Sequence, residues 1–254
     1  MSVWVLLRGL SREARHWGEF PAQLRAAVGA ERVLAVDLPG NGALSAQRSP
    51  TTVAEMVEHV RQSLRHAAPA AYHVLGLSLG GMVAIEWASR HRQELAGCVL
   101  LNSSVRPFGA FYERLRPRNY VGLLRLALVE RDACHREAAI LRLTSSAPPA
   151  QLAALWARYS AEQPVTRANV GRQLVAAARY RAPAQAPLVP MLVLAGAADR
   201  LVDPACSLAL AARWRLPVRV HPSAGHDLAL DDGAWVCGEV RQWLRQTGAT
   251  APVR

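Results

Sequence analysis

The stretch Tyr72-His73-Val74-Leu75-Gly76-Leu77-Ser78-Leu79-Gly80-Gly81 determines the fold that we expect for this chain. Residues 72–77 form an apolar run that predicts a buried strand, and a helical pattern follows over residues 82–90. Between them, Gly76-Leu77-Ser78-Leu79-Gly80 fits the pattern GxSxG, in which a strand turns sharply into a helix with a serine at its tip. Side chains two positions before and after the serine would clash. We therefore predict that Gly76 and Gly80 permit the turn and that Ser78 is a nucleophile.

Short runs that are apolar at every position recur along the chain, as in a parallel sheet covered on both sides. Stretches with helical spacing lie between these runs, and the alternation predicts an open α/β sheet of about six strands flanked by helices. The helix expected at 53–64 has Thr51 and Thr52 as N-cap candidates, with Glu55 three residues after Thr52. The expected strands are 3–7, 33–36, 74–77, 99–101, 191–195 and 218–220, and the other expected helices are 20–28, 82–88, 208–214 and 235–244.

The region from about residue 106 to residue 187 breaks this alternation. It contains no convincing strand, its apolar residues have helical spacing, and several prolines punctuate it. About 80 residues are too many for a plain loop. We therefore predict a core domain of residues 1–105 and 186–254, and a helical cap inserted at 106–185.

A serine hydroxyl is a weak nucleophile and needs an adjacent base. After a nucleophile of this kind the chain order is an acid and then a histidine, each just past the end of a strand. Asp199 follows the expected strand 191–195, and His226 follows the expected strand 218–220 with Gly225 beside it. We predict that His226 is the general base and that Asp199 orients it.

Three neighbouring residues are weaker candidates. Asp203 directly precedes Pro204 and is expected to be the N-cap of the next helix. His221 ends a strand and is interpreted as structural. Asp227 is expected to cap or to form a salt bridge locally, and we predict no catalytic role for it.

The oxyanion donors are expected to be two backbone N–H groups. The helix after Ser78 directs its unpaired N–H groups toward the serine, so the N–H of Leu79 is one candidate. The second should come from the loop after the first strand, where Gly9 permits a tight turn and the N–H of Leu10 would point toward Ser78. An ordinary glycine turn with no catalytic part is the alternative for this loop.

The composition excludes several classes of protein. No apolar run approaches the length of a membrane helix, and the N-terminus lacks the order of a signal peptide, so we expect a cytoplasmic protein. The four cysteines are far apart with no CxxC spacing, so no metal or redox motif is supported and reduced thiols are expected. No metal and no organic cofactor is implied.

Five segments together resemble the α/β-hydrolase superfamily, and the resemblance covers nearly the whole chain outside the insertion. Within it, the chain is most similar to small bacterial carboxylesterases of the pimeloyl-acyl-carrier-protein methyl ester esterase type. The segments are Leu6-Leu7-Arg8-Gly9-Leu10, Asp37-Leu38-Pro39-Gly40-Asn41-Gly42, Gly76-Leu77-Ser78-Leu79-Gly80-Gly81, Gly196-Ala197-Ala198-Asp199-Arg200-Leu201-Val202 and Ala224-Gly225-His226.

The resemblance implies an α/β-hydrolase fold with a cap over the active site and acyl transfer to water. In the haloalkane dehalogenases and epoxide hydrolases of this superfamily, the nucleophile at the turn between strand and helix, the nucleophile elbow, is an aspartate. Ser78 at this position excludes these relatives. The chain departs from the family in having Arg8 where a histidine is usual, and we expect Arg8 to alter the oxyanion loop or to reach a substrate carboxylate. The first strand begins at residue 3, so the two leading antiparallel strands common in the superfamily are expected to be missing.

The favoured hypothesis is a carboxylesterase or thioesterase that forms an acyl-enzyme on Ser78. One alternative is a C–C bond hydrolase or perhydrolase with the same triad. The other is a non-catalytic binding protein of the same fold, and turnover above a Ser78→Ala background separates it from an enzyme.

The chain carries a formal charge of +11, with 30 basic residues that are all arginine. Residues 106–185 contain 13 arginines and 5 acidic residues, so most of the excess lies in the predicted cap. A basic cap attracts anionic partners. Three interpretations stay open: an acidic acyl carrier protein, as the resemblance implies, a small anionic substrate, or a solvated face with no partner. No nucleic-acid recognition motif is present.

Overall fold

A six-stranded parallel sheet forms the centre of the molecule. The structure is a computed structural model that describes residues 2–66 and 71–248. The sheet has the order β2-β1-β3-β4-β5-β6, and every pairing in it is parallel. The predicted α/β fold with about six strands is confirmed. The strands are β1 (Val3–Leu7), β2 (Arg32–Val36), β3 (Tyr72–Leu77), β4 (Leu95–Leu101), β5 (Met191–Gly196) and β6 (Val218–His221).

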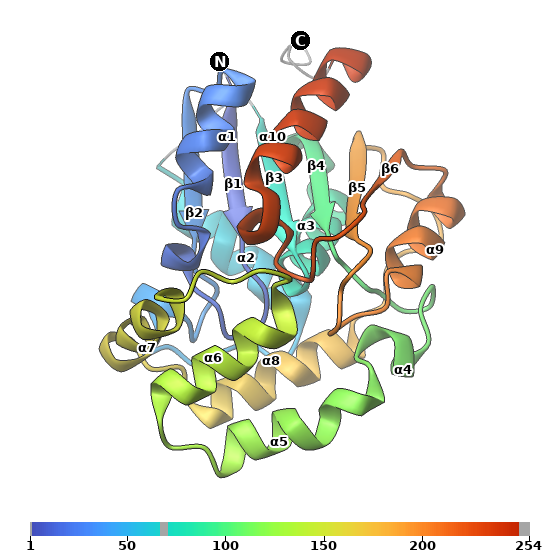
Figure 1. Cartoon of the computed structure of the whole chain (residues 1–254). Coiled ribbons are helices and arrows are strands. Elements are labelled where there is room, and N and C mark those ends of the chain that lie inside the picture. The colour runs from blue at the N-terminus through green and yellow to red at the C-terminus, as the bar shows by residue number, and fades with distance from the viewer. Residues whose placement is uncertain (1, 67–70, 249–254) are drawn as a thin grey trace.

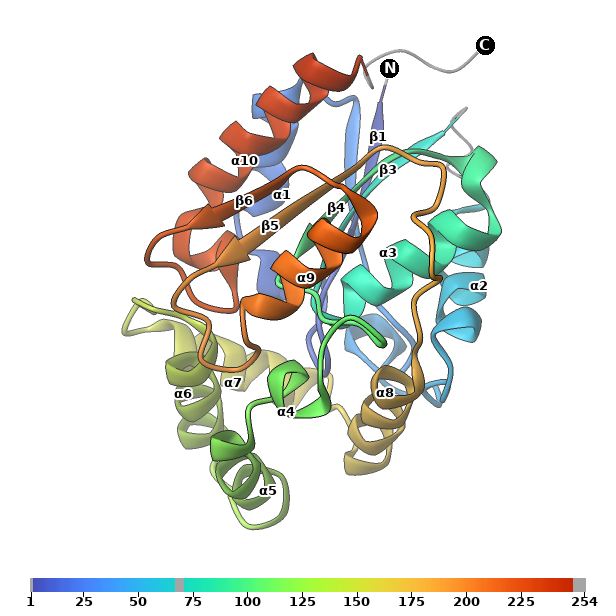
Figure 2. The same ribbon diagram turned by 90° about the vertical axis from the view of Figure 1, so that its right-hand side faces the viewer.

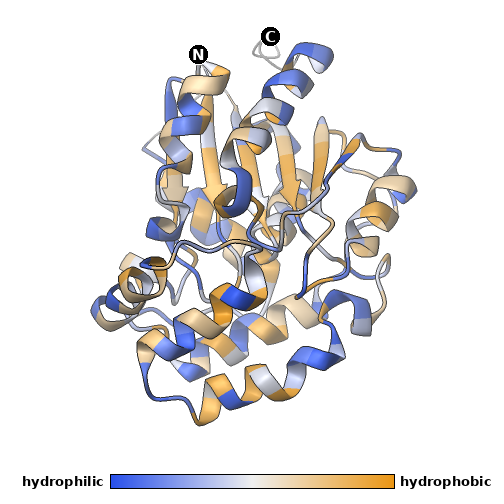
Figure 3. Ribbon diagram, viewed as in Figure 1, coloured by the Kyte–Doolittle hydropathy of each residue, from blue (hydrophilic) through white to orange (hydrophobic). Residues whose placement is uncertain are grey.

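Helices cover both faces of the sheet (Figures 1 and 2). In β1 the side chains of Val3, Val5 and Leu7 enter one apolar cluster, and those of Trp4 and Leu6 enter the other. This is the two-residue period of a strand that is buried on both sides. The strands are accordingly the most hydrophobic layer in Figure 3. One cluster contains α2 (Val53–Leu64), α3 (Leu79–Arg90) and α9 (Ala205–Trp214), and the other contains α1 (Phe20–Val28) and α10 (Leu228–Thr247).

Strand β4 begins four residues earlier than the expected strand at 99–101. The sequence concealed this half because Gly97 interrupts it. A Cβ at Gly97 would lie 2.7 Å from the ring of Trp243, so the glycine leaves room for a helix α10 side chain against the sheet. A glycine in a strand often marks such a close approach.

Helix α2 begins where the capping pattern predicts. Thr52 is its N-cap, and the Thr52 hydroxyl accepts a hydrogen bond from the backbone N–H of Glu55 at 3.3 Å. The remaining helical turns in the core are short 3-10 segments, at Ala14–Trp17, Gly42–Leu44 and Arg92–Glu94. Within the described ranges, no helix has the length and hydropathy needed to cross a membrane.

The segment between β4 and β5 lies beyond the carboxyl ends of the strands, and we call residues 106–185 the helical insertion (Figure 1). Its two ends are adjacent, because Arg106 and Arg181 form a parallel β-bridge and Ala182 N–H donates to the carbonyl of Arg106 at 2.7 Å. The insertion contains α4 (Phe111–Arg114), α5 (Tyr120–Leu128), α6 (Ala133–Thr144), α7 (Leu152–Glu162) and α8 (Arg167–Arg179), with a 3-10 turn at Pro117–Asn119.

Arginines in the segment after β1 hold α6 and α7 against the core. Arg12 forms an ion pair with Glu137 of α6 at 2.6 Å, and its guanidinium lies 4.7 Å from the ring centroid of Trp156 in α7. Arg15 pairs with Glu162 and lies over the Tyr159 ring. In both cases the guanidinium group meets a carboxylate of opposite charge and the face of an aromatic ring.

Helix α8 is held to the core by amide hydrogen bonds instead. The Gln173 side chain is fully buried, donates to Asn41 and Ser49, and accepts from the N–H of Ser11. The side chain of Asn169 accepts from the N–H of Ser49 at 2.9 Å. The insertion is therefore joined to the core at its two ends and through α6, α7 and α8.

The turn from β3 to α3 is the most crowded backbone at the centre of the sheet. Ser78 has φ 56° and ψ −112°, a conformation that is strained for a residue with a side chain. A Cβ at Gly76 would lie 2.3 Å from the carbonyl oxygen of Gly80, and a Cβ at Gly80 would lie 2.1 Å from that of Leu7. Both obstacles are backbone atoms and cannot move aside.

Replacement of Gly80 by alanine should therefore destabilise the protein by about 3 kcal/mol or more, because the added methyl overlaps the backbone of β1. Gly171→Ala is the matched control, since a Cβ there meets nothing within 4 Å and Gly171 lies inside α8. That variant should be stabilised by about 0.5–1 kcal/mol. Urea unfolding of both variants checks this. A Gly80→Ala protein as stable as wild type would contradict the packing described.

Candidate active site

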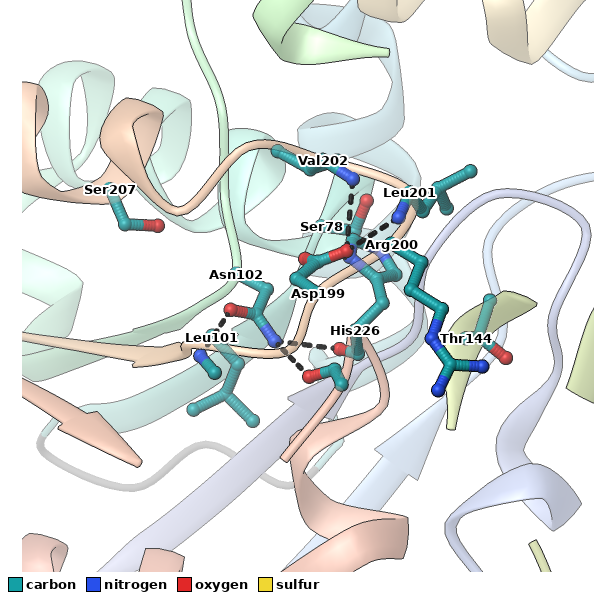
Figure 4. Close-up of polar contacts among 12 residues, drawn as sticks. Ser78, Leu101, Asn102, Thr144, Asp199, Arg200, Leu201, Val202, Ser207 and His226 are labelled. Carbon is teal, nitrogen blue, oxygen red and sulfur yellow. Dashed lines mark hydrogen bonds and ion pairs between the residues drawn. The ribbon is translucent and has the colours of Figure 1, made fainter. Parts of the chain in front are cut away.

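Three of the predicted site residues lie just beyond the carboxyl ends of strands of the one sheet. Ser78 follows β3, Asp199 follows β5, and His226 follows β6. The structure brings Asp199 and His226 into contact, with 2.7 Å between the histidine Nδ1 and Asp199 Oδ2, and both residues are buried (Figure 4). Ser78 and His226 line the same cavity.

Backbone donors fix the carboxylate of Asp199. Its second oxygen, Oδ1, accepts hydrogen bonds from the N–H groups of Leu201 at 2.8 Å and Val202 at 2.9 Å (Figure 4). One oxygen is thus held by the loop and the other by the histidine. This is the arrangement needed to fix the ring's orientation and its tautomer.

Asp203 has a different environment. The N-cap of α9 is Pro204, so the expectation that Asp203 occupies this position was wrong by one residue. The Asp203 carboxylate still accepts from the N–H of Ala205 at 3.0 Å, and it pairs with Arg116 at 3.1 Å.

The electrostatic surroundings of His226 raise its pKa. Burial of the ring opposes this by penalising the charged form, and the Arg8 cation opposes it too. The charge of Asp199, the hydrogen bond to it and the charge of Asp227 outweigh both. The ring is therefore more basic than an ordinary histidine.

Asn102 is a site residue that the sequence interpretation missed. Its side chain donates to the carbonyls of Gly225 and His226 at 3.0 and 2.8 Å, and accepts from the N–H of Gly196 at 2.8 Å (Figure 4). It therefore joins the end of β5 to the histidine loop. Its place directly after β4 was the available signal, because polar residues at carboxyl strand ends often serve the site.

The loop after β1 passes beside the nucleophile. A Cβ at Gly9 would lie 3.3 Å from Cβ of Ser78, so only glycine allows this approach without displacement. Leu10 and Leu79 both line the cavity. Among the described residues, no acceptor is bonded to the N–H of either leucine, which leaves both groups available to a ligand.

Arg8 forms a buried, two-fold contact with Asp227. Its Nη1 and Nη2 donate to Oδ1 and Oδ2 of Asp227 at 3.1 and 2.5 Å, and its guanidinium lies 4.6 Å from the ring centroid of Trp17. Asp227 is the N-cap residue of α10, although its side chain makes no capping hydrogen bond. The alternative of a local salt bridge was wrong, because Arg8 is 219 positions away. Arg8 is engaged with this carboxylate, so the pair links the loop after β1 to the residue after His226.

His221 has a part in the histidine loop's geometry. Its Nδ1 accepts from the N–H groups of Ser223 and Ala224 at 3.2 and 2.9 Å, and its Nε2 lies 3.2 Å from Asp232. These contacts shape the turn that leads to His226.

The cavity has a volume of about 780 Å³ and is walled by both the core and the helical insertion. Of the phenylalanine, tyrosine and tryptophan residues of the helical insertion, Phe111 and Tyr120 line it. The others, Phe108, Tyr112, Trp156, Tyr159 and Tyr180, do not. No cluster of three or more His, Cys, Asp or Glu side chains suited to a metal ion occurs in the part of the chain described.

Comparison with known proteins identifies relatives over part of the chain. A biotin biosynthesis bifunctional protein BioHC of Teredinibacter turnerae is 35% identical over 101 residues, which cover 39% of this chain and 17% of that protein. A pimeloyl-[acyl-carrier protein] methyl ester esterase of Edwardsiella ictaluri is 38% identical over 100 residues, covering 39% of this chain and 36% of the esterase. The matches thus span about a third or less of these relatives.

Solved structures share the fold over almost the whole chain. An enol-lactonase from Burkholderia xenovorans LB400 superposes with a TM-score of 0.77 over 96% of this chain and 91% of its own, at 21% identity. The model of the alpha/beta hydrolase family matches residues 4–239. The chain therefore belongs to the alpha/beta hydrolase family.

Proposed function

We propose that the protein is a serine hydrolase that cleaves carboxylic ester or thioester bonds through an acyl-enzyme on Ser78. The observation that carries this proposal is the buried His226–Asp199 pair in the cavity that also contains Ser78. Ester hydrolysis is also the activity in the name of the Edwardsiella relative.

In the proposed cycle, His226 accepts the proton of Ser78 as the hydroxyl oxygen attacks the carbonyl carbon. The N–H groups of Leu10 and Leu79 donate to the oxygen that becomes negative. The leaving alcohol or thiol departs with the proton from His226. Water then loses a proton to His226 and attacks the acyl-enzyme, which releases the acid and restores Ser78.

The helical insertion supplies the other wall of the site and acts in this proposal as its cap. Leu123 and Ile140 from the insertion line the cavity together with Met82 from the core. An apolar cavity of about 780 Å³ suits a small to medium acyl chain.

Two other functions use the same residues differently. A C–C hydrolase or perhydrolase shares the triad, and a receptor of this fold binds without turnover. The buried Asp199–His226 hydrogen bond, in the cavity that also contains Ser78, favours an active base over an idle one, because binding alone needs no oriented proton acceptor.

Ser78→Ala should abolish both covalent labelling by a fluorophosphonate and hydrolysis of 4-nitrophenyl esters, because the nucleophilic oxygen is removed. Intact-mass spectrometry should show one adduct on wild type and none on the variant. Ser104→Ala is the matched control, since Ser104 lines the same cavity and should leave labelling unchanged. Labelling of Ser78→Ala equal to wild type would exclude Ser78 as the nucleophile.

Asp199→Asn should move the acidic limb of the pH–rate profile to lower pH. In wild type the neutral ring of His226 is the base, so activity should rise with pH through a pKa above the ordinary value of about 6.5. Without the Asp199 charge, burial remains and lowers that pKa. The plateau should also fall by about 10³–10⁴-fold.

Asp203→Asn is the control for that measurement, because Asp203 lies four positions from Asp199 in the sequence and pairs with Arg116 rather than with His226. Its profile should match wild type. An Asp199→Asn limb at the wild-type position would show that the titrating group is not His226.

A second candidate function is hydrolysis of an acyl ester carried by an acidic carrier protein. The helical insertion has a net charge of +8, and Arg116 is its only arginine with a carboxylate partner within the described ranges. The Edwardsiella relative is named for a carrier-bound substrate. A basic surface accelerates encounters with an acidic partner in a salt-dependent way.

On this hypothesis, kcat/KM for a carrier-bound ester should fall at least about tenfold as salt rises from about 0.05 to 0.5 M, because salt screens the attraction. For a neutral ester of the same acyl group it should change less than about twofold. Steady-state kinetics at several salt concentrations test this, and equal responses of the two substrates would contradict it.

A further inference from the structure

The wall of the cavity is apolar over most of its area but carries five arginines. Two of them are neutralised: Arg8 by Asp227 and Arg12 by Glu137. The other three, Arg106, Arg114 and Arg181, have no carboxylate within ion-pair distance in the described part of the chain. Asp227 is the only acidic residue on the wall, and it is bound to Arg8. The cavity therefore holds an excess of positive charge.

Two of these arginines are held near each other by the backbone, and the third lies close to one of them. Arg106 and Arg181 are paired across the β-bridge that closes the helical insertion, and both line the cavity. Arg114 belongs to α4 and is close enough to Arg106 for the two charges to interact. Three arginines, two of them exposed at the surface, thus line the cavity on the side where the insertion begins and ends.

Arg114 has unused hydrogen-bonding capacity. One terminal nitrogen, Nη2, donates to the carbonyl of Ala177 at 2.6 Å, but Nε is buried without a partner. Burial lowers the pKa of this group, Cys206 opposes that effect, and the charge of Arg106 adds to it, so that the pKa is lowered on balance. An anion in the cavity would offset this lowering.

Arg106 and Arg181 lie opposite each other in the β-bridge, and like charges placed in this way are destabilising. Guanidinium groups bind carboxylates and phosphates through paired, charge-assisted hydrogen bonds. The rest of the wall offers leucine and isoleucine side chains, which suit a hydrocarbon chain. A ligand that satisfies the whole cavity has an apolar middle and an anionic end.

We propose that Arg106, Arg114 and Arg181 form a subsite for a terminal carboxylate or phosphate on the substrate, remote from the bond attacked by Ser78. The substrate is then an anionic ester or thioester rather than a neutral one. This statement about the substrate rests on the proposed hydrolase function, whereas the binding of the anion does not require catalysis.

The kinetic test compares esters that differ only at the end of the acyl chain. Mono-4-nitrophenyl glutarate ends in a carboxylate where 4-nitrophenyl pentanoate ends in a methyl group, and mono-4-nitrophenyl suberate with 4-nitrophenyl octanoate tests a longer span. Arg106→Gln and Arg181→Gln should each raise KM for at least one half-ester about tenfold and change KM for its neutral partner less than about twofold.

Arg179→Gln is the matched control. Arg179 is exposed, as Arg106 and Arg181 are, and it lies two positions from Arg181 but does not line the cavity. Its replacement by glutamine removes the same charge. It should behave as wild type toward all four esters. If Arg179→Gln weakened the half-esters as much as Arg181→Gln, or if the arginine variants affected both members of each pair equally, the subsite would be excluded in favour of general attraction or altered packing.

A binding measurement separates this proposal from the hydrolase function. Thermal unfolding of Ser78→Ala is followed with glutarate, with suberate and with inorganic phosphate, at constant ionic strength. At least one anion should raise Tm, and Arg106→Gln or Arg181→Gln in the same background should remove the shift while Arg179→Gln retains it. A shift with a dicarboxylate alone identifies a carboxylate site, and one with phosphate alone a phosphate site.

The absence of a shift with all three anions, or a shift that survives both arginine substitutions, would overturn the subsite. Anion-specific shifts in a protein that hydrolyses none of the esters would instead sustain the subsite and reject the hydrolase.

Discussion

Between the end of β3 and the start of α3 the backbone comes so close to itself, and to the end of β1, that no side chain fits at Gly76 or Gly80. The closeness has two results. It places Ser78 at a tip with positive φ, in front of the first turn of α3, and it brings the loop of Gly9 beside the serine. The strain at one residue is offset by the packing of the whole sheet around it.

The other half of the site depends on polar contacts between chain segments that are distant in sequence. Asn102 binds the loop of His226 to the end of β5. Arg8, in the loop after β1, binds Asp227, the residue that follows His226. Buried ion pairs add little net stability compared with apolar packing, but loss of one partner is costly. The effect of the Arg8–Asp227 pair and of the Asn102 hydrogen bonds is geometric, since both restrict where His226 can lie relative to the turn at Ser78.

The parts of this structure that local patterns predict are those that local physics determines. The apolar runs predict the strands, Thr52 and Glu55 predict the start of α2, and the GxSxG pattern predicts the turn at Ser78. The first half of β4 was missed because Gly97 interrupts its apolar run. The need for a glycine there comes from the ring of Trp243, a residue far along the chain that packs against it. The partners of Arg8 and Asn102 were likewise beyond reach, because a side chain's nearest contact across 100 or more positions has no signature in either segment alone.

The β-bridge between Arg106 and Arg181 brings the two ends of the helical insertion together at one point of the core. An insertion that leaves and returns at the same place imposes no requirement on the spacing of β4 and β5. Its length and sequence can therefore vary while the sheet and the turn at Ser78 stay as they are, so long as the contacts that Glu137, Trp156 and Gln173 make with the core are kept or replaced. Such a joint makes the insertion a separable part of the chain, and a chimaera that carries another relative's helices between these two positions would keep the sheet and change the wall of the cavity.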